Sequence, residues 1–233
     1  MNEEMTFFSV PQGKEWERFS AQMEMLPAFK ACSGVYTDGE LLVCDKNSGV
    51  ETEGELLMEL LSIYGEVYPV HRLDANTEGL VLFARTKEKQ AELEERFYRH
   101  EIRKIYHAVL AGIPQNGSGK LVHYAKKDAE KSTMTVCKEG TPDAVRMELD
   151  YKILKKSGDC CLAEINLHTG KTHQIRVQMA AIGCPVLGDD KYGNRELNKK
   201  YHIRIQQLLC KQMSWDNYEF KSLKKVELPV TEN

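Results

Sequence analysis

The order of apolar and polar residues along the chain predicts more strands than helices. Short apolar runs rich in β-branched and aromatic residues are typical of strands, and the run GLVLFAR after Glu78 is typical of a buried one. The predicted strands cover Leu41–Asp45, Gly79–Arg85, Lys104–Gly112, Lys120–Ala125, Ser132–Cys137, Val145–Leu154 and Cys161–His168. Because many of these runs are consecutive, we expect an α+β fold with a mixed, largely antiparallel central sheet.

The same pattern predicts helices at Glu53–Tyr64, Lys87–Arg99 and Thr172–Ile182, which we expect to flank the sheet. Thr52 and Glu55 have the spacing of a capping box at the start of the first helix. The second helix is highly charged, and its Leu93 and Phe97 stand four residues apart, on one helical face. Gly183 is placed to end the third helix.

The length of the chain favours one large domain, which could be divided into two lobes. A chain of 233 residues can bury a substantial core. Residues 1–34 have a mixed composition, and we interpret them as an N-terminal extension of a main domain formed by residues 35–233. No window reaches 18 consecutive apolar residues, and the N terminus lacks the residue order of a signal peptide. We therefore expect a cytoplasmic protein that binds no membrane.

Cysteine usage and net charge narrow the class further. The seven cysteines are scattered and form no C-x-x-C pair, which predicts reduced thiols and no structural metal. A formal charge of −3 is not typical of a nucleic-acid-binding protein, so an anionic partner must meet a local basic patch. Basic residues gather in Arg99–Lys104, Lys120–Lys131, Arg195–Arg204 and Lys221–Lys225. Taken singly, each such run is more often a solvated surface.

Two familiar motifs appear only in fragments. HTGKT, from His168 to Thr172, contains the GKT of a phosphate-binding P-loop, but Ile165 stands where that loop requires its first glycine. HRLD resembles the kinase H-R-D motif, but Asp74 comes one place late and Gly79 replaces the expected asparagine. Both readings fail.

The residues that remain as candidates for chemistry are Asp74, Tyr106 and Arg176. A carboxylate that stays ionised can act as a covalent nucleophile, and the planar fork of an arginine such as Arg176 can hold it ionised and oriented. The helix predicted from Thr172 would also present free N–H groups to an anion such as phosphate. Taken alone, however, an aspartate before a strand is usually a turn residue, and a strand tyrosine is usually core.

Three segments together resemble successive motifs of the RluA-type RNA pseudouridine synthases. They are HRLDANTEGLVLFARTKE, KIYHAVLAG and LHTGKTHQIRVQMAAIGCPVLGDDKYG, and LLVCDKNSGV is a weaker upstream match. The resemblance covers roughly residues 35–193. It implies the pseudouridine synthase fold, with the active site in a cleft. It also implies conversion of specific uridines in structured ribosomal or transfer RNA to pseudouridine, without cofactor or metal.

By motif position, the resemblance makes Asp74 the catalytic aspartate, Tyr106 the active-site tyrosine beside the base and Arg176 the partner of the aspartate. It also suggests substrate-binding roles for His71, Arg72, Lys104, Gly170, Lys171, Thr172, His173 and Gln174. A stacked uridine must be flipped out to reach a buried carboxylate. Arg72 is then expected to fill the vacated space or to hold the displaced strand.

The RNA backbone is expected to lie against Lys104 and Lys171, which would position the RNA without reading its sequence. The basic segments near Lys126 and Lys199 would select the target by shape. About 34 residues at the N terminus are too few for a separate RNA-binding module, so recognition must rest on the main domain. We expect a monomer.

The chain departs from the family pattern at several positions. Glu78 stands where the family usually has serine or threonine, and Asn47 interrupts the usual lysine-proline pair. Lys171 replaces a common arginine, and Gln178 replaces a common histidine. None of these changes removes Asp74, Tyr106 or Arg176, so they bear more on which RNA is the target than on whether the chain is active.

Two alternatives from other classes stay open. One is an RNA-binding protein or RNA-folding chaperone that keeps the scaffold, against which the intact Asp74, Tyr106 and Arg176 argue. The other is a glycoside hydrolase, which would need two carboxylates across the scissile bond and has only Glu78 as a second candidate.

Overall fold

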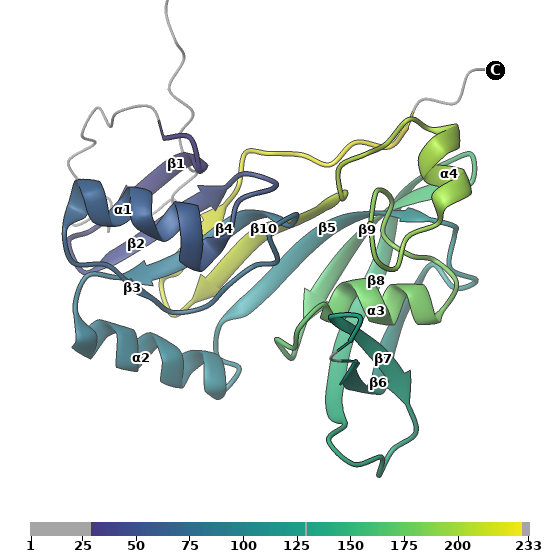
Figure 1. Cartoon of the computed structure of the whole chain (residues 1–233), viewed down its shortest axis with the longest axis horizontal. Coiled ribbons are helices and arrows are strands. Elements are labelled where there is room, and N and C mark those ends of the chain that lie inside the picture. The colour runs from purple at the N-terminus through teal and green to yellow at the C-terminus, as the bar shows by residue number, and fades with distance from the viewer. Residues whose placement is uncertain (1–28, 129, 230–233) are drawn as a thin grey trace, which may run out of the picture. The chain divides into compact units, whose positions relative to one another are not determined.

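The computed structural model describes residues 29–128 and 130–229, which form two compact units (Figure 1). The first unit contains the described residues up to Arg103 together with Cys210–Lys224. The second contains Lys104–Leu209 and the described residues from Lys225 onward. Most of the predicted N-terminal extension lies outside the described residues, so the boundary at residue 34 stays a prediction.

The first unit is a sheet with helices. Its elements are β1 (Cys32–Thr37), β2 (Leu41–Lys46), the π-helical turn η2 (Thr52–Leu56), α1 (Leu57–Tyr64), β3 (Tyr68–Pro69), β4 (Glu78–Ala84), α2 (Lys87–Tyr98), β10 (Leu208–Trp215) and β11 (Tyr218–Lys221). The strand order is β1-β2-β4-β10, with β3 paired to β4 and β11 to β10. The pairs β1–β2, β2–β4 and β10–β11 are antiparallel.

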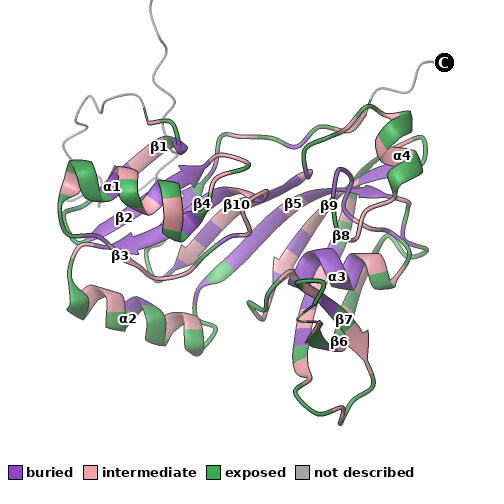
Figure 2. Cartoon of the chain, in the orientation of Figure 1, coloured by how far each residue is buried: buried purple, intermediate pink, exposed green. Residues whose placement is uncertain are grey.

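Strand β4 lies at the centre of the core of this unit. Every residue from Leu80 to Ala84 is fully buried, as expected for a short run that is apolar on both faces (Figure 2). Val43 of β2 pairs with Leu82, and α2 packs on β4 with Leu93 buried. The predicted strand after Glu78 and the predicted charged helix are therefore confirmed.

The helix predicted over Glu53–Tyr64 is present, but its first turn is irregular. Its start, η2, contains Gly54 in a non-helical conformation (φ −104°, ψ −111°), and regular α1 begins only at Leu57. The helix ends at Gly65 as predicted, because a φ of +75° at that position suits glycine and stops the helix.

The second unit contains a run of antiparallel strands and, among its described residues, two helices. Its elements are β5 (Arg103–Ala111), β6 (Ser118–Asp128), β7 (Thr133–Cys137), β8 (Val145–Ser157), β9 (Cys160–Leu167), α3 (Gln174–Ala181) and α4 (Arg195–Lys200). The strands follow the order β5-β9-β8-β6-β7, and every neighbouring pair is antiparallel. The predicted α+β class with a largely antiparallel sheet is confirmed.

Helix α3 packs against β7 in the second unit. Val177 on its buried side joins Ala125, Met134 and Met147 in one apolar cluster. The helix begins at Gln174, two residues later than predicted, because His173 before it adopts a left-handed conformation (φ 52°, ψ 22°). The prediction that Thr172 opens the helix is therefore wrong.

The structure also bears on the predictions made from the cysteines and from the apolar runs of the chain. No disulfide joins the seven cysteines, all of which lie in the described residues, so the prediction of unpaired thiols is confirmed. Within the described ranges, no helix has both the length and the apolar character needed to cross a membrane.

Candidate active site

Asp74 lies in a tight turn of the first unit, just before β4. The turn is closed by the N–H of Thr77, which donates to the carbonyl oxygen of Asp74 at 3.0 Å. The next carbonyl, that of Ala75, accepts from the N–H of Gly49 at 2.9 Å and from the ammonium of Lys46 at 2.8 Å. The turn that carries the partly buried Asp74 is therefore fixed to the segment that follows β2.

Thr52 fixes the chain on the other side of Asp74. Its buried hydroxyl donates to the carbonyl of Leu73 and accepts from the N–H of the same residue, both at 3.2 Å. The predicted capping box of Thr52 and Glu55 is therefore wrong. Glu55 does reach back, but to the N–H of Glu51 at 2.9 Å, and the Thr52 hydroxyl is used by the Asp74 turn instead of its own helix.

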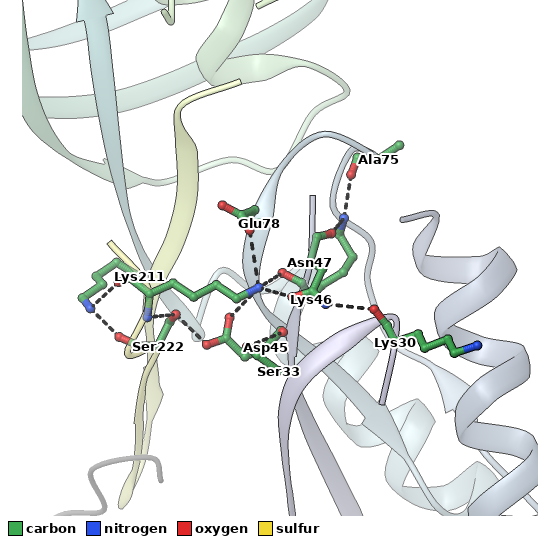
Figure 3. A network of polar contacts seen from close by, with 10 residues as sticks. Lys30, Ser33, Asp45, Lys46, Asn47, Ala75, Glu78, Lys211 and Ser222 are labelled. Atoms are coloured by element: carbon green, nitrogen blue, oxygen red, sulfur yellow. Dashed lines mark hydrogen bonds and ion pairs between the residues drawn. The ribbon is translucent and has the colours of Figure 1, made fainter. Parts of the chain in front are cut away.

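Lys46 is completely buried beneath this turn. Among the described residues, its ammonium donates to the backbone carbonyls of Asn47 (3.0 Å), Val50 (2.8 Å) and Ala75 (2.8 Å), and Figure 3 shows its place beside Ala75. Burial, together with the nearby Lys224 ammonium, lowers the pKa of Lys46 to about 8, against the opposing effect of the Glu78 and Asp74 carboxylates. The three carbonyls supply the hydrogen bonds that a buried ammonium group needs.

His71 and Arg72, both predicted to contact substrate, differ in exposure. The His71 ring packs on Phe97 in a tilted arrangement with centroids 4.6 Å apart, and its Nε2 accepts from the N–H of Leu82 at 3.0 Å. The Arg72 side chain is 72% exposed and forms an ion pair with Glu53 at 3.2 Å. His71 thus helps to fix the turn to β4, whereas Arg72 extends from the turn into solvent.

Tyr106 and Lys104 lie on β5, in the second unit. Tyr106 is buried and stands opposite Ile165 of β9. Lys104 is also buried, with 4% of its surface exposed. This burial does not support the predicted contact with an RNA phosphate. Tyr106 is held by a strand that is paired along its length, which gives its ring a fixed position within the unit.

Arg176, on α3, binds two aspartates of the loop that follows the helix. Its Nε and Nη2 donate to the two carboxylate oxygens of Asp189 at 2.7 and 2.9 Å, and Nη2 also donates to Asp190 at 2.9 Å. The guanidinium lies 5.3 Å from the ring centre of Tyr192. A two-point bond to a buried carboxylate fixes both the position and the plane of the guanidinium.

Asp189 is ionised in this pair. Burial alone would raise the pKa of its carboxyl group, but Arg176 and the N–H groups of Tyr192 and Lys191 outweigh burial and lower it. Sequence reasoning missed Asp189, although it lies in the quoted motif segment that ends in GDDKYG. The available signal was a pair of aspartates directly after Gly188, in the same motif as Arg176.

The turn from Gly170 to Gln174 is organised by the Gln174 side chain. Its oxygen accepts from the hydroxyl of Thr169 at 2.8 Å and from the N–H of Lys171 at 3.0 Å. Its nitrogen donates to the carbonyl of Glu148 at 3.0 Å and to Gln178 at 3.1 Å. The buried Gln174 therefore shapes the turn from within, while Gly170, Lys171 and Thr172 are exposed.

The predicted residues thus fall in both units. Asp74, His71 and Arg72 belong to the first, and all other candidates, Tyr106 and Arg176 included, belong to the second. Within the second unit, the structure joins Arg176 to the loop that carries Asp189 and Tyr192. His173 also reaches this loop, because its Nδ1 lies 2.9 Å from the Tyr192 hydroxyl.

Comparison with known proteins identifies the family. The family model described as RNA pseudouridylate synthase matches residues 39–181, a range that includes Asp74, Tyr106 and Arg176. The chain belongs to this family. It is 32% identical over 176 residues to ribosomal large subunit pseudouridine synthase C of Rickettsia conorii, covering 70% of this chain and 57% of that protein.

A second relative, ribosomal large subunit pseudouridine synthase D of Pseudomonas aeruginosa, is 31% identical over 175 residues, covering 69% of this chain and 53% of that protein. The chain thus spans little more than half the length of these curated relatives.

Solved structures share the fold. Human RNA pseudouridylate synthase domain containing 1 matches with a TM-score of 0.69 and 23% identity, covering 89% of this chain and 86% of that one. Human RNA pseudouridylate synthase domain containing 4 matches with a TM-score of 0.68 and 21% identity, covering 81% of this chain and 87% of that one. The expected pseudouridine synthase fold is confirmed.

Proposed function

We propose that this chain converts specific uridines in structured RNA, ribosomal or transfer RNA, to pseudouridine. The observation that carries the proposal is the family match over residues 39–181 with Asp74, Tyr106 and Arg176 all intact. The N1–C1′ bond of the nucleotide breaks and a C5–C1′ bond forms, while C5 loses a proton to solvent and N1 gains one. The sum is an isomerisation, so its balance needs no oxidant, reductant or cofactor.

Asp74 is the proposed nucleophile. The support is local: hydrogen bonds to Thr77, Leu73 and Ala75 fix the backbone on both sides of its carboxylate. A carboxylate on a fixed turn can meet C1′ of a flipped nucleotide without first ordering the chain, which lowers the entropic part of the barrier.

Tyr106 and Arg176 are proposed to act in the same reaction, by motif position. Tyr106 would contact the uracil and handle the C5 proton, and Arg176 would be the charged partner of Asp74. The bond from Arg176 to Asp189 supports the second role, because a charge fixed before the substrate arrives stabilises developing charge without reorganisation. The expected cleft around these residues stays a prediction.

The uridine is proposed to be flipped out of its stack before reaction. After the N1–C1′ bond breaks, the uracil must rotate to bring C5 to C1′, and a stacked base has no room to do so. Arg72 is the proposed residue that fills the gap or holds the displaced strand. Its support is its place two residues before Asp74 and its exposed side chain.

The RNA backbone is proposed to contact the turn from Gly170 to His173, with Lys171 as the exposed cation. Gln174 is buried, so its proposed role in RNA binding is indirect: its side chain holds the turn that contacts the RNA. The relatives named above are ribosomal large subunit enzymes, which favours ribosomal RNA among the possible targets of this chain.

The reaction is tested with RNA carrying tritium at uridine C5. The purified chain should release tritium to water, and Asp74→Asn should release none because an amide cannot replace the nucleophile. Asp143→Asn, a change of the same chemistry at an exposed loop position, should behave like wild type. RNA binding without release in wild type would instead support the RNA-binding or chaperone alternative, and free sugar or base would support hydrolysis.

A further inference from the structure

Two departures from the family pattern meet at one lysine of the C-terminal segment. Lys224 follows β11, and its ammonium donates to the side-chain oxygen of Asn47 at 2.7 Å and to the carbonyl of Lys46 at 2.6 Å. The same nitrogen lies 3.5 Å from the Glu78 carboxylate and 3.8 Å from that of Asp45. All of these residues belong to the first unit.

Two contacts of Lys224 lead to the turn that carries Asp74. Glu78 comes directly after Thr77, whose N–H closes the Asp74 turn. Lys46, whose carbonyl Lys224 binds, extends its own ammonium to Ala75, next to Asp74 (Figure 3). Two short paths therefore lead from one ammonium to the turn that begins at the proposed nucleophile.

The segment that carries Lys224 is itself anchored. The buried Ser222 hydroxyl donates to Asp45 at 2.7 Å and accepts from the N–H of Lys224 at 3.1 Å. The ammonium of Lys211, on β10, donates to the carbonyls of Ser222 and Lys224. The Lys224 side chain is only 18% exposed, so its contacts are shielded from bulk water and stronger than those of a surface lysine.

The identities of Asn47 and Glu78 suit this arrangement. The N–H of Asn47 donates to Ala31 and its side-chain nitrogen donates to Lys30, both at 2.9 Å, while its side-chain oxygen accepts from Lys224. A proline at position 47 could make none of these bonds. A serine or threonine at position 78 would be shorter than glutamate and would carry no charge to attract the lysine.

We propose that Lys224 is a positioning residue for the Asp74 turn, and that Asn47 and Glu78 are its coupled partners in this chain. The inference rests on the proposed function, in which Asp74 reacts with uridine. It accounts for Glu78, an added negative charge four residues from Asp74, as one side of a link between the C-terminal segment and the active-site turn.

The test compares Lys224→Met with Lys225→Met, a change of the same size at the exposed neighbouring lysine. Amide hydrogen exchange should become faster in a peptide covering residues 71–79 of Lys224→Met, with β9 in the second unit unchanged. In tritium release, its kcat should fall by about tenfold or more while KM stays within about twofold, because a misplaced nucleophile slows the chemical step. Lys225→Met should change neither quantity.

A second pair of variants keeps the test decisive if Lys224→Met does not fold. Glu78→Gln and Asn47→Ala each remove one partner of Lys224 and should produce the same faster exchange to a smaller degree. In a double-mutant cycle, adding Glu78→Gln to Lys224→Met should slow kcat by less than Glu78→Gln does alone, because the two side chains act through one contact.

The possible failures are distinguishable. If wild type and all variants lack tritium release, the proposed function fails and the exchange data alone decide whether Lys224 positions the turn. If wild type is active but Lys224→Met matches Lys225→Met in exchange and kcat, the positioning role is overturned. A raised KM with unchanged kcat and unchanged exchange would also overturn it, because that result describes a contact with RNA.

Discussion

The guanidinium of Arg176 and the carboxylate of Asp189 form a two-point hydrogen bond, at 2.7 and 2.9 Å, in which both side chains are buried. The bond joins the first turn of α3 to the loop that follows the helix. Removal of either charge would leave the other buried without its two-point partner, which is costlier than the loss of an exposed ion pair.

Asp189→Asn should therefore destabilise the chain by about 3–5 kcal/mol at pH 7. Because folding lowers the pKa of Asp189, its stabilising contribution is complete above the unfolded value of about 3.9 and is lost as the pH falls toward the folded value. In urea unfolding, the difference between wild type and variant should narrow from pH 7 to pH 3. Asp190→Asn, whose side chain is 56% exposed, should cost less than about 1 kcal/mol. An equal cost for the two variants would contradict the prediction.

Thr52→Val should lower both stability and activity. The substitution keeps the size of the side chain but leaves the buried N–H and carbonyl of Leu73 without the hydroxyl, at a cost of about 1–3 kcal/mol. Since Leu73 precedes Asp74, kcat for tritium release should fall as well. Thr52→Ser keeps the hydroxyl and is the control, and it should retain most of kcat. Equal kcat values for the two variants would show that the hydroxyl does not position the turn.

Gly79→Ala should be poorly tolerated. Gly79 has a φ of +106°, and a Cβ atom there would lie 2.3 Å from the carbonyl oxygen of Cys210, so the change strains the backbone and pushes β4 from β10. A loss of about 3 kcal/mol or more is expected in denaturant unfolding. Gly49→Ala, at a φ of +80° with open space around it, should cost only about 1–2 kcal/mol. The prediction fails if Gly79→Ala is the milder change.

Arg72→Ala should affect activity more than stability. Its ion pair with Glu53 is exposed, so the change should cost less than about 1 kcal/mol of folding free energy. Tritium release from a folded RNA should fall by about tenfold or more, since flipping a stacked base costs a few kcal/mol, and release from a short flexible oligonucleotide should fall less. Glu53→Gln removes the same ion pair but keeps Arg72, and it should stay active on both RNAs. Unchanged activity of Arg72→Ala on both would exclude the proposed role.

Charge reversal at Lys126 and Lys199, both exposed in the second unit, should weaken RNA binding. If each lysine contacts one phosphate, the slope of log affinity against log salt should become shallower by about 0.7–0.9 per contact. Lys156→Glu, at another exposed position of that unit, is the matched control. Unaltered affinity and slope in the reversed variants would rule these segments out of RNA recognition.

The sequence by itself determined the local elements and the family. Periodicity and turn residues located β4, α2 and the stop at Gly65, because these features depend on neighbours within a few residues. The order of three motifs pointed to Asp74, Tyr106 and Arg176 within the matched family range, although their shared role stays a proposal.

Only the tertiary structure decided which partners the polar side chains found. The Thr52 hydroxyl, predicted to cap its own helix, bonds instead to Leu73, 21 residues away. Glu78, which no local pattern explained, lies beside Lys224, 146 residues later in the chain. A buried polar group must be paired, but its choice of partner depends on which segments the fold brings together, and the spacing of residues in the sequence does not contain that information.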